Sequence, residues 1–163
     1  MGLIIRKAEK KDNQILAKII RKTFEEHDAP RTGTVYSDPT TDDLYGFFKK
    51  PASVLWVAVV DEKVIGCCGV YPSSGLEKEF AELVKFYLTK KSRGKGFGKI
   101  LLHKCIESAK EMGYRQLYLE SLPQFSNAVK LYEKEGFRRL DNPLGDFIHS
   151  SCSIWMLKDL NQE

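Results

Sequence analysis

Apolar and polar residues follow two different spacings along this chain, and each spacing predicts one kind of element. In residues 13–26 the apolar side chains recur every third or fourth position, which is typical of an amphipathic helix with one buried face. The predicted buried face carries Ile15, Leu16, Ile19, Ile20 and Phe24. Similar spacing predicts further helices at residues 40–48, 98–112 and 126–135.

Shorter and more continuous apolar runs lie between these helices and predict β-strands. The expected strands are 3–7, 53–60, 64–71, 79–89, 115–120, 137–140 and 151–158. This order of elements favours an α/β fold with a mixed central sheet and helices on both faces. No repeat, low-complexity segment or linker interrupts the order, so we expect residues 1–163 to form a single domain.

Glycine and proline mark where several elements stop. Gly113 and Gly136 follow two predicted helices, at the position where a residue at ease with a positive φ fits best. Residues 27–38 contain Pro30 and Gly33 among polar residues, so we expect a loop without regular structure there.

Composition and charge mainly exclude nucleic-acid and membrane partners. Of the 163 residues 42% are hydrophobic and 29% are charged, which is typical of a soluble globular domain. A net charge of +4, spread along the chain, is too small to predict a nucleic-acid partner. No apolar run is long enough for a membrane span, and the N-terminus lacks the apolar core of a signal peptide. We therefore expect a cytoplasmic protein with no membrane partner.

Four cysteines are present, and their spacing indicates neither a metal site nor a disulfide framework. No Cys-x-x-Cys pair occurs, so we expect no bound metal. Cys67 and Cys68 are adjacent in a predicted strand, where successive side chains point to opposite faces of the sheet. We expect reduced thiols in the core.

The most informative stretch is residues 82–102, where a strand leads through a glycine- and lysine-rich loop into an amphipathic helix. Gly94, Gly96 and Gly98 allow a tight turn and let a ligand approach the backbone N–H groups closely. The helix directs unpaired N–H groups and the positive end of its dipole toward this loop, which predicts a phosphate cradle. A Walker loop and a dinucleotide fingerprint are both excluded, because Lys99 stands where each pattern requires glycine.

The spacing Arg93-x-x-Gly96-x-Gly98 fits a different group of proteins. It resembles the Arg/Gln-x-x-Gly-x-Gly/Ala signature of the GNAT superfamily of acyl-CoA-dependent N-acetyltransferases. The order of predicted elements is similar to the GNAT fold over essentially the whole chain. The resemblance implies a mixed, mostly antiparallel central sheet with helices on both faces, and acetyl-CoA as co-substrate.

A second motif lies further along the chain, from Asn127 through Tyr132 to Gly136 and Phe137. It resembles the family's segment in which an Asn and a small residue precede a Tyr and then a Gly-Phe pair; the small residues here are Ala128 and Val129. The two motifs in this order are much more specific than either alone.

The resemblance implies how acetyl-CoA would be held. The pantetheine arm would pair like an added strand with backbone groups of Phe86, Tyr87 and Leu88, and Asn127 would hydrogen-bond the arm. The pyrophosphate would lie in the loop formed by Arg93, Gly94, Lys95, Gly96, Phe97, Gly98 and Lys99.

Acetyl transfer to an amine needs a group that removes the amine's proton and a group that protonates the departing thiolate. In GNAT proteins whose base lies in this strand, a Glu stands six residues before the position of Leu88, which nominates Glu82 as general base, directly or through a water. Two plainer interpretations remain open: Glu82 could face solvent, or it could pair with Lys85. Glu120, at the end of the next predicted strand, is the reserve candidate for the base.

The resemblance also implies that the Tyr132 hydroxyl lies at the thioester sulfur and protonates the thiolate or holds it by a hydrogen bond. The alternative is an ordinary core aromatic residue that packs with Ala128 and Leu131.

His149 and Cys152 invite a nucleophile interpretation, but no carboxylate is obviously arranged in the sequence to orient His149. We expect both to be structural, with a second possibility that residues 143–150 border the acceptor pocket. We expect His27 and His103 to be solvated.

These observations favour an N-acetyltransferase that uses acetyl-CoA and acts on a primary amine, carried by a small molecule or a peptide. We expect acceptor selectivity to come from residues 27–38, the helix at 40–48 and residues 141–150. A homodimer is compatible with this interpretation. The alternative is a non-catalytic acyl-CoA-binding regulatory module, which would need the glycine loop and Asn127 but neither base nor acid.

Overall fold

The computed structural model describes residues 2–161, and within them the strands form one seven-stranded sheet. The strands are β1 (Leu3–Lys7), β2 (Val54–Val60), β3 (Lys63–Tyr71), β4 (Phe80–Leu88), β5 (Gln116–Ser121), β6 (Arg138–Arg139) and β7 (Ile154–Asp159). Their order across the sheet is β1-β2-β3-β4-β5-β7-β6. Only β4 and β5 run parallel; the other neighbours among the described strands are antiparallel. The predicted mixed, mostly antiparallel sheet is confirmed.

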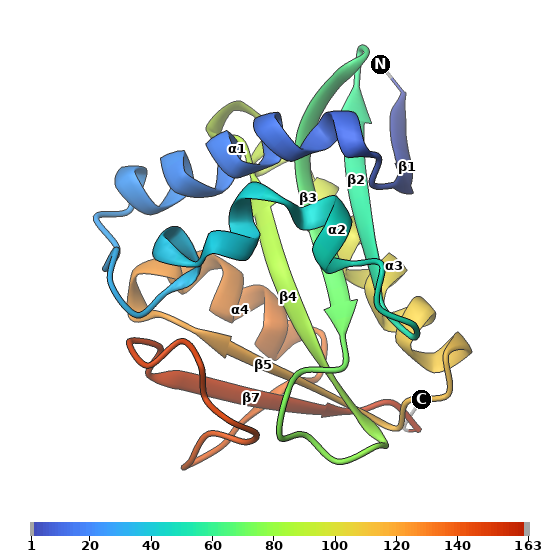
Figure 1. Ribbon diagram of the computed structural model, residues 1–163, viewed down its shortest axis with the longest axis vertical. Helices are drawn as coiled ribbons and strands as arrows, with labels where there is room; N and C mark the ends of the chain where they lie inside the picture. Colours follow the sequence, from blue (N-terminus) through green and yellow to red (C-terminus); the bar gives the residue numbers. More distant parts are fainter. Residues whose placement is uncertain (1, 162–163) are drawn as a thin grey trace.

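Helices cover both faces of this sheet, as the sequence predicted (Figure 1). They are α1 (Asn13–Glu26), α2 (Leu44–Phe47), α3 (Phe97–Glu111) and α4 (Ser126–Lys134). Apolar residues of α1 and α2 pack in one buried cluster, and those of α3 and α4 pack in a second cluster. The adjacent Cys67 and Cys68 belong to different clusters, which confirms that they point to opposite faces.

The helix predicted at 40–48 is divided in two. Asp38 accepts a hydrogen bond from the backbone at the start of a 3-10 turn, Pro39–Asp42. Asp43 then leaves the helical region, with φ of −138°, and its carboxylate accepts a hydrogen bond from Gly46 N–H at 3.0 Å, where α2 starts. The two aspartates offer the backbone competing acceptors, so two short turns replace one longer helix.

Other elements differ from the prediction at their edges. Ile15 is 37% exposed, because it lies beside rather than within the buried face of α1. The loop at 27–38 contains a 3-10 turn, Val35–Ser37, which the Thr34 side chain caps. The last two strands are shorter than predicted, at Arg138–Arg139 and Ile154–Asp159.

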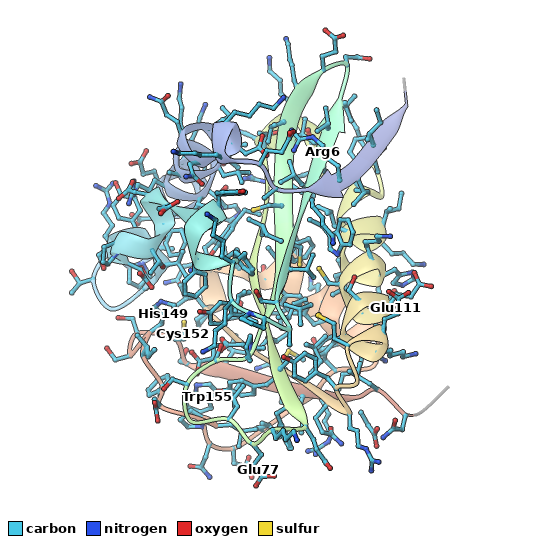
Figure 2. The ribbon with its side chains drawn as sticks, turned by 45° about the vertical axis from the view of Figure 1, so that its right-hand side comes forward. Arg6, Glu77, Glu111, His149, Cys152 and Trp155 are labelled. Carbon is cyan, nitrogen blue, oxygen red and sulfur yellow. The ribbon has the colours of Figure 1, made fainter. Side chains whose placement is uncertain are left out.

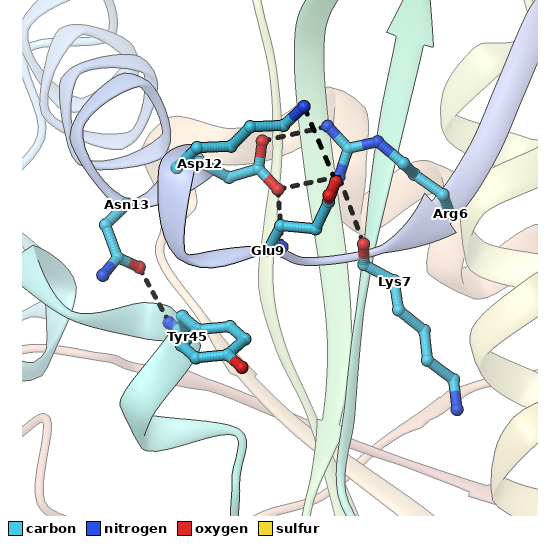
Figure 3. A network of polar contacts seen from close by, with 7 residues as sticks. Arg6, Lys7, Glu9, Asp12, Asn13 and Tyr45 are labelled. Carbon is cyan, nitrogen blue, oxygen red and sulfur yellow. Dashed lines mark hydrogen bonds and ion pairs between the residues drawn. The ribbon is translucent and has the colours of Figure 1, made fainter.

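A buried ion pair fixes the start of α1 against the end of β1 (Figure 3). The Arg6 guanidinium donates to both carboxylate oxygens of Asp12, at 2.8 and 3.0 Å, and Glu9 N–H donates to Asp12 at 2.7 Å. Burial alone would raise the pKa of Asp12, but the bonds from Arg6 and Glu9 lower it below its usual value. Beside it, Asn13 Oδ1 accepts from Tyr45 N–H at 2.8 Å, so the same corner also holds α2.

We expect Asp12→Asn to lower the free energy of unfolding by about 1–3 kcal/mol, because an amide would face donors that now converge on a carboxylate. Urea unfolding at pH 7 measures this loss. Since the folded pKa of Asp12 lies below the ordinary value of 3.8, the contribution is present above that pH and is lost as pH falls through the folded pKa.

The matched control is Asp42→Asn. Asp42 also receives two hydrogen bonds from one guanidinium, that of Arg21, but its side chain is 63% exposed. Its replacement should cost less than about 1 kcal/mol. Equal losses in the two variants would show that burial of Asp12 does not set the strength of this corner.

Candidate active site

The candidate active site lies where β4 and β5 separate. The two strands pair only over residues 80–82 and 116–118 and diverge beyond them (Figure 1). Two residues of β4, Lys85 and Phe86, lie opposite the single β3 residue Cys68, which forms a β-bulge. Lys85 adopts a φ of +58° there. The bulge and the separation together open a gap in the middle of the sheet.

Past the bulge, β4 turns backbone groups toward this gap. Thr89 N–H donates to a carbonyl of β3 at 2.8 Å, so the alternating backbone of an extended strand points the groups of Phe86 and Leu88 the other way. Tyr87 pairs with β3 instead. The Leu88 carbonyl accepts two hydrogen bonds from Arg93, at 3.1 and 3.0 Å.

A cavity of about 460 Å³ occupies the gap and is bordered by residues of α1, α3 and α4. Lys95 is exposed on the loop outside this lining, and Phe97 packs against the apolar core. The other site residues predicted from the sequence all line the cavity: Glu82, Phe86, Tyr87, Leu88, Arg93, Gly94, Gly96, Gly98, Lys99, Asn127 and Tyr132.

The glycine loop borders the cavity at the N-terminus of α3. Gly94 and Gly96 have φ values of +76° and +85°, which favour glycine. Gly98 serves packing instead, because a Cβ there would lie 3.2 Å from the Phe86 ring. Ile100 N–H donates to Gly96 O at 3.3 Å and makes the first turn of the helix. The N–H groups before Ile100 have no helical acceptor, so they are available to an anion.

Arg93 joins three parts of the site. Besides the Leu88 carbonyl, its guanidinium contacts the Glu26 carboxylate at 2.7 Å and the Thr23 hydroxyl at 3.4 Å. These bonds tie α1 to the end of β4. Arg93 therefore has a positioning role beside the loop.

Glu82 and Glu120 come together where β4 and β5 separate, and both border the cavity. Burial, and then the negative charge of Glu120, raises the pKa of Glu82 to about 7. Burial also raises the pKa of Glu120, which accepts a hydrogen bond from the Tyr118 hydroxyl at 2.8 Å. Glu82 is only partly exposed and forms no ion pair with Lys85. Neither of the plainer interpretations of Glu82 describes this environment.

Tyr132 is buried at the cavity wall, between the rings of Phe86 and Phe137, with centroid distances of 6.0 and 5.7 Å. Burial raises its pKa, so the phenol stays protonated at neutral pH. Its ring thus packs as a core aromatic residue, and the residue also borders the cavity.

The prediction that no carboxylate orients His149 was wrong. His149 Nε2 lies 2.9 Å from Asp38 Oδ2. Burial would raise the pKa of Asp38, but hydrogen bonds from His149 and Thr40 lower it to about 2, so this carboxylate accepts and Nε2 donates. The sequence hides the pair because 111 positions separate its members.

Cys152 lies next to His149, and its N–H donates to the His149 carbonyl at 3.0 Å (Figure 2). Burial, and then the charges of Glu120 and Glu82, raises the pKa of the Cys152 thiol to about 12. A thiol that stays protonated is a poor nucleophile.

The other two histidines are also held by neighbours. His27 was expected to be solvated, but it is partly buried, borders the cavity and lies 2.9 Å from the Thr23 carbonyl through Nδ1. His103 is half exposed, and its Nε2 lies 2.6 Å from Glu135. Of these two histidines, His27 is the one that borders the cavity.

A second cavity of about 350 Å³ lies beside the first. It is walled by Phe47 of α2, Tyr71 of β3 and the segment 144–149. The Tyr118 hydroxyl accepts a hydrogen bond from Leu144 N–H at 3.0 Å and so holds this segment to the sheet. The two cavities share Glu82, Val84, Lys85, Glu120 and His149.

Residues 18–137 match the acetyltransferase (GNAT) family. The chain belongs to this family. It is 34% identical over 158 residues to the uncharacterized N-acetyltransferase YjgM of Escherichia coli (strain K12), a match that covers 96% of this chain and 95% of that protein. It is 30% identical over 131 residues to the uncharacterized N-acetyltransferase YsnE of Bacillus subtilis (strain 168), covering 78% and 84%.

Solved structures confirm the expected GNAT fold. A GNAT acetyltransferase from Staphylococcus aureus Mu50 has a TM-score of 0.82 at 21% identity and covers 98% of this chain and 100% of its own. PaiA N-acetyltransferase from Thermoplasma acidophilum, solved with coenzyme A, has a TM-score of 0.74 at 22% identity, covering 98% and 99%. YncA from Salmonella typhimurium, solved with its cofactor acetyl-CoA, has a TM-score of 0.76 at 18% identity, covering 100% and 96%.

Two features are absent from residues 2–161. No helix in this range is long and apolar enough to cross a membrane. No group of three or more His, Cys, Asp or Glu side chains in this range could hold a metal ion.

We expect Glu82 to titrate near pH 7, and Glu120→Gln to lower its pKa, because the variant removes the neighbouring negative charge. Carboxyl ¹³C NMR on protein labelled at glutamate measures both values. Glu77→Gln is the control, since Glu77 is exposed and should leave the titration of Glu82 unchanged. A Glu82 titration near the ordinary value of 4.5 in the unchanged protein would contradict the buried pair.

Proposed function

We propose that this GNAT protein transfers an acetyl group from acetyl-CoA to a primary amine by direct attack, with Glu82 as base and Tyr132 as acid. One observation carries the proposal: a carboxylate with a pKa of about 7 and a buried tyrosine border one cavity that reaches the glycine loop. Membership of the family and the N-acetyltransferase names of its relatives support this activity. We further propose a cytoplasmic location, which rests on the sequence alone.

The chain offers suitable groups to acetyl-CoA, which would supply an acetyl group activated as a thioester. The unpaired N–H groups at the start of α3, with Lys99 beside them, suit a pyrophosphate. Phe86 and Leu88 offer backbone groups along the gap for an extended arm, and Asn127 borders the same cavity. Glu82 lies at the paired end of the gap, and the loop follows the other end of β4.

Glu82 is suited to removing the proton of the amine. A free alkylammonium has a pKa of about 10, so it must lose a proton before it attacks at neutral pH. A carboxylate with a pKa near 7 is substantially ionised at that pH and is a much stronger base than an ordinary glutamate. The proton passes to Glu82 directly or through one water. Glu120 raises the basicity of Glu82 and remains the reserve base.

Tyr132 is suited to stabilising the departing thiolate. Its phenol stays protonated at neutral pH, and Phe86 and Phe137 fix its ring at the cavity wall. The hydroxyl donates a hydrogen bond to the sulfur as the carbon–sulfur bond breaks, and then transfers its proton or holds the thiolate.

The alternative is a non-catalytic acyl-CoA-binding regulatory module. Such a module would use the gap, the glycine loop and Asn127. It would not need two partly buried carboxyl groups close together at the end of the gap. Holding Glu82 next to Glu120 destabilises the ionised site, and a residue that must exchange a proton near neutral pH is a use that accounts for this cost. The pair therefore favours the enzyme.

We expect Tyr132→Phe to lower kcat by about tenfold to a thousandfold while coenzyme A affinity changes little, because the variant removes only a hydroxyl group. Release of the free thiol measures kcat, and calorimetry measures the affinity. Tyr114→Phe is the matched control, since the Tyr114 hydroxyl donates to Ala52 O at 2.7 Å away from the cavity. An unchanged kcat in Tyr132→Phe would show that water protonates the thiolate.

We expect Glu82→Gln to slow acetylation and to change how the rate depends on pH. In the unchanged protein kcat/KM should rise as pH rises through about 7, where Glu82 loses its proton. The variant should lose this step and follow the ionisation of the amine itself. Amines of low pKa should therefore be acetylated better by the variant, relative to strongly basic ones. A set of amines of graded pKa, assayed by thiol release, measures this difference.

Glu77→Gln provides the control for this experiment, as an exposed glutamate outside the cavity. Equal losses for weakly and strongly basic amines would indicate that Glu82 binds the ammonium without removing its proton. Full activity in Glu82→Gln would assign the base to Glu120 or to a water molecule.

A further inference from the structure

One buried charge in the site has no partner within the described chain. The Lys85 side chain is 5% exposed, yet it borders both cavities. Within residues 2–161 its ammonium group makes no hydrogen bond and no ion pair; its nearest aromatic contact is the Phe47 ring, 5.4 Å from centroid to nitrogen. The ammonium group opens onto the cavities and has no partner there among the described residues, so this position suits an anion that arrives with a ligand.

The carboxylates nearby do not act as the partner of the Lys85 ammonium group. Asp38 is already satisfied: Oδ1 accepts from the N–H and hydroxyl of Thr40, at 2.9 and 2.7 Å, and Oδ2 accepts from His149 at 2.9 Å. Glu82 makes no ion pair with Lys85. Burial lowers the pKa of Lys85, and the charges of Asp38 and then Glu82 only oppose that effect.

Lys85 is also distinct from the proposed phosphate cradle. It follows Glu82 by three positions on β4, at the bulge, whereas the glycine loop begins only after β4 has ended. Lys85 and Glu82 both border the second cavity, which none of the loop glycines lines. The lysine therefore faces the side on which the acceptor, rather than the pyrophosphate, would lie.

The charges around the shared region form a dipole. Glu82 and Glu120 make one negative side and Lys85 makes a positive one, and all three border both cavities. A ligand that carries an ammonium and a carboxylate a few ångströms apart complements both sides at once. A simple alkylamine complements only the negative side.

We propose that the acceptor is an α-amino acid, whose carboxylate binds the ammonium group of Lys85 while its amine faces Glu82. This inference rests on the proposed function and names the substrate class of the same site. The carboxylate gains a charge-assisted hydrogen bond in a buried place, and the lysine gains the partner that the chain does not provide. The orientation also presents the amine, rather than the carboxylate, to the base.

The second cavity is suited to the side chain of such an amino acid. The Phe47 and Tyr71 rings stack at 4.0 Å with an angle of 8° and form part of its wall. Leu76 and Phe147 add apolar surface. A volume of about 350 Å³ accommodates an apolar side chain of moderate size.

The test compares matched acceptors with acetyl-CoA, assayed by thiol release. Each of a set of L-amino acids is paired with its carboxamide and with the amine that lacks the carboxyl group, for example phenylalanine, phenylalaninamide and phenethylamine. The unchanged protein should prefer the acid. Lys85→Met should lower the ratio of kcat/KM for acid over amide by about tenfold or more, mainly through KM, because a hydrogen bond to a charged group is lost. The same acid and amide are assayed with both proteins, so the difference in amine pKa between the two acceptors does not affect the change in the ratio.

Lys50→Met is the matched control, because Lys50 also borders the second cavity but is exposed and lies over the Tyr71 ring. It should leave the ratio unchanged. Acetylation of amines without any preference for a carboxylate would overturn this inference and leave the proposed function standing. A Lys85→Met variant that keeps the acid-over-amide ratio of the unchanged protein would also overturn this inference alone. So would a Lys50→Met variant that lowers this ratio as much as Lys85→Met does. No thiol release with any amine would overturn both.

Discussion

The site depends on one constraint of the backbone: β4 cannot pair with β5 over its whole length. The β-bulge at Lys85 and the divergence after Glu82 leave backbone groups of β4 without a strand partner. Buried backbone groups need hydrogen-bond partners, so the end of β4 is held by other means. Arg93 takes the Leu88 carbonyl and at the same time binds Glu26 of α1. The gap is thus a fixed part of the fold, and the residues proposed for chemistry are arranged along it.

Burial then sets the protonation of the groups along the gap. It favours the neutral form of each of them, raising the pKa of Glu82, Tyr132 and Cys152 and lowering that of His149. Only Asp38 is firmly charged among the acids, because three hydrogen bonds hold its carboxylate. In such surroundings a net charge is unfavourable unless a partner lies beside it. The site is therefore sensitive to the charge of whatever enters it.

The sequence predicted the elements well because local signals specify them. The spacing of apolar residues located α1 and α3. Gly113 follows the end of α3 and Gly136 follows the end of α4, with φ values of +88° and +93°. Where local signals compete, prediction was less accurate, as at Asp38 and Asp43, whose side chains divide one expected helix. All the site residues predicted from the sequence except Lys95 and Phe97 line the cavity, because each motif is one continuous segment.

Contacts between distant segments could not be predicted in this way. The sequence gives no sign that Asp38 meets His149, or that the hydroxyl of Tyr118 joins Glu120 to Leu144. Lys85 reads as an ordinary surface residue of a strand until the bulge turns it inward. Each of these positions depends on the three-dimensional path of the chain, and a single sequence carries no record of which distant residues meet.

The wall of the second cavity has a consequence for how this protein could diversify. Two of the bonds that hold this wall and the segment after it join main-chain groups alone: Asp146 N–H donates to Ser74 O at 3.0 Å, and Ser151 N–H donates to Gly33 O at 3.0 Å. Main-chain bonds tolerate many side chains, so the residues facing the cavity can vary while the wall keeps its place. The limits lie at the points of closest approach, since a Cβ on Gly75 would lie 2.6 Å from Asp146 N. Evolution could thus exchange one acceptor for another in this wall without disturbing the strand that carries the acid–base chemistry.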